Sequence, residues 1–171
     1  MVLAKPQTFM NLSGEAVAPL YRKHCGEPGD LVVVHDDLDL PPGTVRLKRG
    51  GGTGGHNGLR SLREELGTPD FLRIRVGVGR PPPGADPAEY VLAPPSPEHR
   101  EAFEESVGVA CEAAREIARL GFGKAMTRRN ARARTPRPDS PAGNILLAPG
   151  GKTGGSISRK EATPHDDSEE V

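Results

Sequence analysis

The pattern of apolar and polar residues predicts helices and strands that alternate along the chain. Residues 13–24 carry apolar side chains at helical spacing, with Ser13 expected as the amino-terminal cap. Residues 31–34, the run LVVV, are typical of a short strand that is buried on both faces. Residues 44–49 alternate apolar and basic side chains, which predicts a second strand with an apolar face and an outward basic face.

The alternation continues beyond a glycine-rich segment. Apolar residues at helical spacing predict a helix over residues 59–66, ended by Gly67. Residues 72–78 alternate apolar side chains with arginines, so we expect another half-buried strand with a basic polar face. A long helix is expected between a Ser96 cap and Gly121. Its apolar stripe is expected to comprise Phe103, Val107, Ala110, Ala114 and Ile117.

Strands separated by helices favour the α/β class. We therefore expect a single domain over residues 1–134, built as a mixed β-sheet flanked by helices. Only 35% of the residues are apolar, which is low for a chain that folds throughout. Residues 135–171 are rich in proline, glycine, serine and charged residues and lack aromatic residues, which predicts a disordered, low-complexity tail.

The net charge is zero, but the basic residues are unevenly distributed. Residues 46–63 hold five Lys or Arg and no acid, and residues 124–134 hold another five with no acid. These two runs are candidate surfaces for a polyanion. The alternative is an ordinary solvated surface with no partner.

Cys25 and Cys111 follow neither a CxxC spacing nor the pattern of a secreted disulfide framework. No run approaches the ~20 apolar residues of a membrane span, and the amino terminus lacks the apolar core of a signal peptide. We expect a cytoplasmic monomer that does not contact a membrane.

The segment from His35 to Gly58 carries the candidate chemistry. His35 and Asp36 follow the predicted strand at its carboxyl end, where ligands bind in open α/β sheets. The aspartates and histidines of this segment could form a metal site. However, successive aspartates on an extended chain point to opposite sides, so Asp36 and Asp37 are poor co-ligands. A carboxylate that orients an imidazole is the simpler interpretation.

The glycine-rich run at residues 50–55 has the composition of a phosphate-binding loop but lacks the lysine and hydroxyl residue of a P-loop. Its backbone could approach a large ligand closely, or it could be a mobile surface loop. Asn11 and Asn57 lie in loop contexts, where a primary amide can hold a water or an ester carbonyl or can serve as an ordinary turn residue.

Four segments together resemble bacterial peptidyl-tRNA hydrolase in sequence, order and spacing, over roughly residues 1–131. They are KPQTFMNLSGEAV at 5–17, HDDLDLPPG at 35–43, GGGTGGHNGLRSL at 50–62 and FLRIRVGVGRP at 71–81. The resemblance implies hydrolysis of the ester that joins a peptide to the 3′ ribose of tRNA, with water as the nucleophile and without a metal or other cofactor.

The resemblance also implies roles for individual residues. Asp36 would orient a general-base histidine, and Asn57 would position the water or the substrate carbonyl. Phe9 and Asn11 would line the groove for the tRNA end and the peptide. Lys48 and Arg75 would bind phosphates of the acceptor stem, whatever the sequence of the tRNA.

One part of the family pattern has no match in this sequence. Family members begin with a strand, a Gly-x-x-Asn-Pro-Gly loop and a Thr-Arg-His-Asn segment that supplies the general base. Judged against family length, about 55–60 residues are missing at the amino terminus. We expect a misassigned start codon, with a true fragment or a remodelled tRNA-binding protein as the alternatives. His56 is not expected to replace the base, because a mobile glycine loop would not fix its geometry.

Two other functions remain open from the sequence. One is a catalytically inactive tRNA-binding fragment of such an enzyme, which would bind RNA without cleaving it. The other is a metal-dependent hydrolase, whose activity a chelator would abolish.

Overall fold

A three-stranded mixed sheet forms the centre of the domain. The computed structural model describes residues 1–132. Strand β1 (Val32–Asp37) is parallel to β3 (Leu72–Gly77), and β2 (Val45–Arg49) is antiparallel to β3 on its other side. The strand order is therefore β1-β3-β2, with β3 in the middle. The predicted α/β fold, a mixed sheet flanked by helices, is confirmed.

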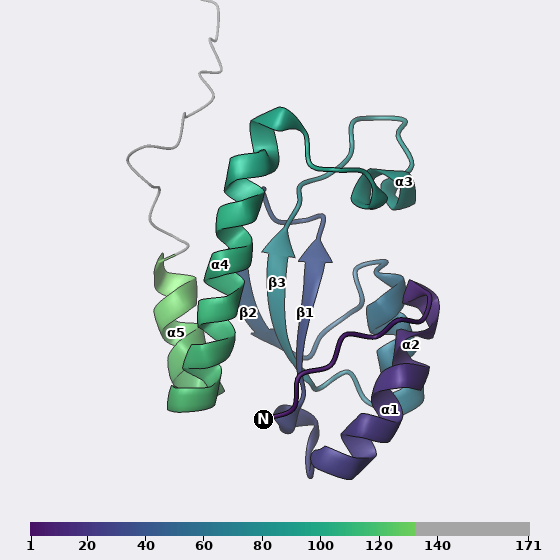
Figure 1. Ribbon diagram of the computed structural model, residues 1–171, viewed down its shortest axis with the longest axis vertical. Coiled ribbons are helices and arrows are strands. Elements are labelled where there is room, and N and C mark those ends of the chain that lie inside the picture. Colours follow the sequence, from purple (N-terminus) through teal and green to yellow (C-terminus); the bar gives the residue numbers. More distant parts are fainter. Residues whose placement is uncertain (133–171) are drawn as a thin grey trace, which may run out of the picture. The chain divides into compact units, whose positions relative to one another are not determined.

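Helices cover both faces of this sheet (Figure 1). Helices α1 (Ser13–His24) and α2 (Asn57–Leu66) pack together on one side. Helices α4 (Pro97–Leu120) and α5 (Phe122–Arg132) pack on the other side, where they contact β2 and β3. Three shorter helical segments complete the described chain: two 3₁₀ turns, Met10–Leu12 and Pro28–Asp30, and α3 (Pro87–Leu92).

Two hydrophobic clusters hold the layers together because side chains alternate across the strands. One cluster lies between the sheet and the α4–α5 pair, and its buried members are Val45, Leu47, Ile74, Val76, Ala110, Ala113 and Ala125. The other lies toward α1 and α2, and its buried members are Leu59, Leu62 and Phe71. The alternate residues of β2 and β3, which include Lys48 and Arg75, consequently face the α1–α2 side.

Most predicted helices have the expected bounds, but two details of capping were wrong or incomplete. Gly67 ends α2 in the left-handed conformation with φ 69°, as a glycine at this position favours. Ser13 does not cap α1, because Leu12 occupies the cap position and the Ser13 hydroxyl donates to the Met10 carbonyl at 2.8 Å. Ser96 occupies the cap position of α4 without a side-chain cap bond.

One expectation from apolar patterning was wrong, a second was only partly right, and helices α3 and α5 were not predicted. The first strand runs to Asp37, and among the described strands it is an edge strand; Val34 is 55% exposed, so β1 is not covered on both faces. In the predicted stripe of α4, Ala110 is buried and Phe103, Ala114 and Ile117 pack against the core, but Val107 is exposed. Ser106 and Ala113 are buried in addition. Helix α3 was not predicted, because its six residues are too few for a periodic pattern.

The division into a domain over residues 1–134 and a disordered tail over residues 135–171 stays a prediction. The tail lies outside the described residues.

Candidate functional site

A polar cavity of about 260 Å³ lies beside the carboxyl end of β1. It is built from β1 and the residues after it, from the basic faces of β2 and β3, and from the glycine-rich loop before α2. Its lining residues are His35, Asp36, Asp37, Leu38, Asp39, Lys48, Gly52, Thr53, Gly54, His56, Leu59, Arg73 and Arg75. In open α/β sheets, ligands bind beyond the carboxyl ends of the strands, and the cavity lies at such an end.

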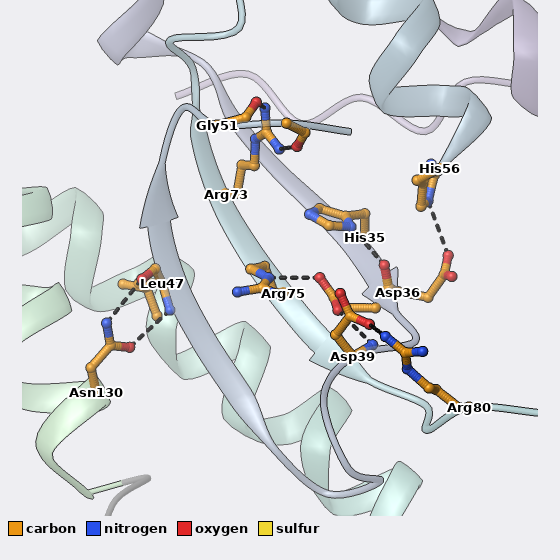
Figure 2. Close-up of polar contacts among 12 residues, drawn as sticks. His35, Asp36, Asp39, Leu47, Gly51, His56, Arg73, Arg75, Arg80 and Asn130 are labelled. Carbon is orange, nitrogen blue, oxygen red and sulfur yellow. Dashed lines mark hydrogen bonds and ion pairs between the residues drawn. The ribbon is translucent and has the colours of Figure 1, made fainter. Parts of the chain in front are cut away.

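His56 connects the start of α2 to the end of β1. Its Nδ1 accepts hydrogen bonds from the backbone N–H groups of Gly58 and Leu59, at 3.0 and 3.3 Å, and so caps the helix. Its Nε2 lies 3.1 Å from Oδ1 of Asp36 (Figure 2). Because Nδ1 is an acceptor, Nε2 carries the proton and donates a hydrogen bond to the carboxylate.

This geometry corrects the expectation that His56 lies on a mobile loop, because three hydrogen bonds fix its ring. It also changes the reason why His56 is a poor general base: both ring nitrogens are already engaged. The hydrogen bond from His56 is the largest cause that lowers the pKa of Asp36, so Asp36 is an anion at neutral pH.

His35 is neutral for a different reason. Its Nδ1 lies 2.6 Å from the backbone carbonyl of Asp36, which can only accept, so Nδ1 carries the proton. Its Nε2 is buried and has no partner among the described residues. Burial lowers the pKa of His35 to about 4. The ring meets that of His56 edge-on, with centroids 5.2 Å apart.

The three aspartates of the HDDLD segment bind three separate partners. Asp36 accepts from His56, Asp37 accepts from Nε of Arg75 at 2.6 Å, and Asp39 forms an exposed ion pair with Arg80 (Figure 2). Burial alone would raise the pKa of Asp37, but the hydrogen bond and charge of Arg75 contribute to a net lowering. Within residues 1–132, no group of three or more His, Cys, Asp or Glu side chains is placed to hold a metal ion.

The outward basic face that was predicted for residues 72–78 is only partly present. Arg75 is half-buried and lines the cavity. Arg73 is 3% exposed and points at the glycine-rich loop, where it donates to the Gly52 and Gly51 carbonyls at 2.6 and 2.8 Å. On β2, Lys48 is exposed and lines the cavity, as its place on the predicted basic face implies.

The second basic run, residues 124–134, is partly an internal ion-pair network. Arg129 is buried and binds Glu116 at 2.6 Å and Glu112 at 3.1 Å, and these bonds raise the pKa of its guanidinium. Arg128 lies 3.9 Å from Glu116. Carboxylates on α4 therefore neutralise part of a surface that the sequence suggested for a polyanion.

The remaining predicted site residues lie near the start of α2. Asn57 is its exposed first residue, directly after His56. The 3₁₀ turn containing Asn11 packs against α2, and a side chain added at Gly58 would meet Sδ of Met10 at 2.6 Å. Phe9, just before this turn, is 80% exposed. Asn57 and the turn that contains Asn11 therefore lie at the start of α2, and the roles of Asn57, Asn11 and Phe9 stay predictions.

Sequence reasoning missed three contributors: the capping role of His56, the pairing of Asp37 with Arg75, and the buried Arg73. The alternation of β3 could have indicated the last two contributors, because it places Arg73 and Arg75 on the same face of the sheet as His35 and Asp37. Strand register was needed to use this signal.

Known proteins are similar to this chain over most of its length. The family model described as peptidyl-tRNA hydrolase matches residues 1–137. A curated peptidyl-tRNA hydrolase of Rhodococcus opacus is 54% identical over 127 residues, and one of Desulfovibrio desulfuricans is 47% identical over 138 residues. A crystal structure of peptidyl-tRNA hydrolase from Acinetobacter baumannii is 36% identical, with a TM-score of 0.63.

The chain spans only part of these relatives. The matches cover 74%, 81% and 74% of this chain, but 67%, 59% and 64% of the Rhodococcus, Desulfovibrio and Acinetobacter chains. None of the helices within residues 1–132 is long and apolar enough to span a membrane.

Proposed function

Because the chain belongs to the peptidyl-tRNA hydrolase family, we propose that it binds peptidyl-tRNA and cleaves the ester between the peptide and the 3′ ribose. The observation that carries the proposal is the hydrogen bond from His56 to Asp36 beside a cavity lined by Lys48 and Arg75. This arrangement brings the anionic Asp36 carboxylate, the first turn of α2 and the cationic side chains of Lys48 and Arg75 together around one cavity.

In the proposed reaction, a water oxygen adds to the ester carbonyl carbon, and the bond from this carbon to the ribose 3′ oxygen breaks. The proton of the water finally reaches the 3′ oxygen, giving a peptide acid and tRNA with a free 3′ hydroxyl. Asn57 positions the water or the carbonyl through its amide. Asp36 supplies the fixed negative charge that orients an imidazole and stabilises its protonated form.

Binding of the tRNA end is assigned to residues around the same cavity. Lys48 and Arg75 contact phosphates. The ion pair with Asp37 engages Nε of Arg75, and neither Nη group is hydrogen-bonded within residues 1–132, so both can face a ligand. Phe9 offers an exposed ring on which a base can stack, and Asn11 follows in the 3₁₀ turn that Phe9 precedes.

A second candidate function is binding of peptidyl-tRNA without cleavage. It is favoured by the engagement of both His56 nitrogens and the burial of the free nitrogen of His35. Within the described residues, no imidazole beside Asp36 has an accessible lone pair. The general-base histidine that the resemblance places outside this sequence stays a prediction.

Hydrolysis of N-acetylated aminoacyl-tRNA by the full chain tests the proposal. We expect ester cleavage that falls by about 100-fold in Asp36→Asn and in Asn57→Ala, since loss of a positioned proton-transfer group has this order of effect. The matched control is Glu64→Gln, which changes an exposed acid on α2 to its amide and should leave cleavage intact.

The same assay separates the alternatives. Salt-sensitive RNA binding without any cleavage would select the second candidate. Loss of cleavage on addition of a chelator would select a metal-dependent hydrolase instead.

A further inference from the structure

Arg73 is a buried cation whose charge has no direct partner. It lies in the middle strand, β3, and 3% of its surface is exposed. No carboxylate within residues 1–132 forms an ion pair with it. Burial, followed by the nearby charge of Arg75, lowers the pKa of its guanidinium. Burying a charge is costly unless other polar groups compensate it, so the remaining contacts of Arg73 must do so.

These contacts are backbone carbonyls from two separate segments. Nη1 donates to the Gly52 carbonyl at 2.6 Å, and Nη2 donates to the carbonyls of Gly51 at 2.8 Å and Pro69 at 3.3 Å. The guanidinium also lies 4.8 Å from the centre of the Phe71 ring. A planar arginine fork can bridge several acceptors at fixed angles, which the single ammonium of a lysine does less well. Arg73 therefore ties the glycine-rich loop to the turn before β3. Figure 2 shows its contact with Gly51.

The loop in turn determines where the Lys48 ammonium lies. Gly51 has φ 97°, and a Cβ at this residue would lie 2.8 Å from Nζ of Lys48. The Lys48 side chain thus lies against the open face of Gly51, whose carbonyl Arg73 holds. Lys48 and Arg73 are also direct neighbours across β2 and β3. The contacts run from Arg73 through the loop to the ammonium at the cavity.

We propose that Arg73 is a positioning residue for RNA binding: it holds the glycine-rich loop so that Lys48 faces the cavity, and it does not contact phosphate itself. This inference rests on the proposed function for its ligand, an RNA phosphate, whereas the ordering of the loop stands independently of it. The burial of Arg73 and the direction of its hydrogen bonds toward the loop distinguish it from Lys48 and Arg75, which line the same cavity.

Two variants of the full chain, Arg73→Lys and Arg73→Gln, test the proposal. The probe is an RNA minihelix that copies a tRNA acceptor stem with its 3′ single strand. Both variants should bind the minihelix about tenfold more weakly, equivalent to about 1.4 kcal/mol. The salt dependence of binding should keep its slope, because Lys48 still contacts its phosphate in the complex and the weaker binding reflects the cost of ordering the loop. Lys48→Ala should lower the slope by about 0.7 to 0.9.

Amide hydrogen exchange supplies a readout that does not depend on RNA. Two backbone bonds flank the loop, from Gly50 N to the Phe71 carbonyl and from His56 N to the Thr53 carbonyl. Exchange at both amides should accelerate in the Arg73 variants while the Leu72 amide stays protected. Arg49→Gln is the matched control, because it removes an exposed charge beside the loop and should alter neither amide.

Unchanged exchange at the Gly50 and His56 amides in both variants would overturn the inference. So would normal binding by Arg73→Lys together with a reduced salt slope for Arg73→Gln, since this pattern indicates a direct phosphate contact. If the variants do not fold, guanidinium NMR of the unmodified chain decides: separate Nη signals for Arg73 support the clamp, and averaged signals overturn it. Failure of the unmodified chain to bind the minihelix would defeat the proposed function alone.

Discussion

At the residue scale, two adjacent histidines have different chemistry because they have different hydrogen-bond partners. His56 accepts two backbone N–H bonds at Nδ1 and donates from Nε2 to Asp36. His35 donates from Nδ1 to a carbonyl, and its other nitrogen is buried without a partner. Each ring is thus held in one neutral tautomer, and the two tautomers are opposite.

The burial of His35 predicts a loss of stability in mild acid. Its pKa is about 4 in the folded chain and 6.5 when exposed, so between these values the unfolded chain binds the extra proton. The free energy of unfolding should therefore decrease as the pH falls from 6.5 to 4, by up to about 1.4 kcal/mol per pH unit. Urea denaturation at several pH values measures this slope.

His35→Gln should flatten the slope in this pH range, because the titrating group is removed. His24→Gln is the matched control, since His24 is exposed at the end of α1. A slope that is unchanged in His35→Gln would assign the pH dependence to other groups. The pKa values of Asp36 and Asp37 are lowered from their ordinary value of 3.8, so the stability that these carboxylates contribute is lost only at more acidic pH.

At the element scale, helix α5 is attached to the sheet through a side-chain amide. Asn130 accepts from the Leu47 N–H at 3.0 Å and donates to the Leu47 carbonyl at 2.9 Å, so it pairs with β2 much as another strand would (Figure 2). Within the described residues β2 is an edge strand. The amide satisfies one residue of that edge and fixes the position of α5 along it.

Asn130→Ala should therefore destabilise the domain by about 1–3 kcal/mol, because a half-buried N–H and carbonyl lose their partners. Equilibrium denaturation monitored by circular dichroism measures the change. Thr127→Ala on the same helix is the control: within residues 1–132 its hydroxyl bonds only to the Gly123 carbonyl in the preceding turn, and its loss should have little effect. Equal stabilities of the two variants would show that the amide pairing contributes nothing.

Apolar periodicity predicted the elements better than their relative orientation. The bounds of α1 and the Gly67 end of α2 could be predicted because apolar periodicity and glycine or proline stop signals act within one or two turns of chain, although the predicted Ser13 cap does not form. The exposure of Val107 on α4 could not be predicted, since Phe103 and Val107 fit the helical stripe equally well in sequence, although only Phe103 packs against the core. Packing against β3 made Ser106 and Ala113 the buried positions.

At the scale of the whole molecule, a chain of zero net charge brings cations and aspartates together at one cavity, which Asp36, Asp37 and Asp39 line with Lys48, Arg73 and Arg75. Lys48 and Arg75 line this cavity, which lies on the α1–α2 side of the sheet. On the other side, the carboxylates of α4 neutralise Arg129. The position of exposed cations that form no ion pair within residues 1–132, such as Lys48, and not the total charge, therefore determines where a polyanion would bind.

This distribution predicts which lysine governs the salt dependence of RNA binding. Lys48→Ala should weaken binding most at low salt, since the lost contact releases counterions. Lys124→Ala removes an equally exposed charge from α5, on the opposite side of the sheet, and should change binding little. Titrations of the acceptor-stem minihelix between about 50 and 200 mM salt measure both. Equal effects of the two variants would contradict a localised RNA site.

The sequence by itself determined the α/β class, most element bounds and the clustering of candidate residues between His35 and Gly58. These properties depend on local signals, which are periodicity, glycine and proline positions, and a conspicuous polar segment. Its four motifs also identified the family that the family model matches.

Only the tertiary structure decided which partner each polar side chain has. Asp36 meets His56 across 20 residues, Arg75 meets Asp37 across 38, and Arg73 reaches the carbonyls of Gly51 and Gly52. These pairs depend on strand register and on the side of the sheet that each residue faces. A shift of one residue in strand register would turn every side chain of the strand to the opposite face of the sheet. Hydrogen bonds of this kind, and the protonation states they impose, arise only when the layers pack.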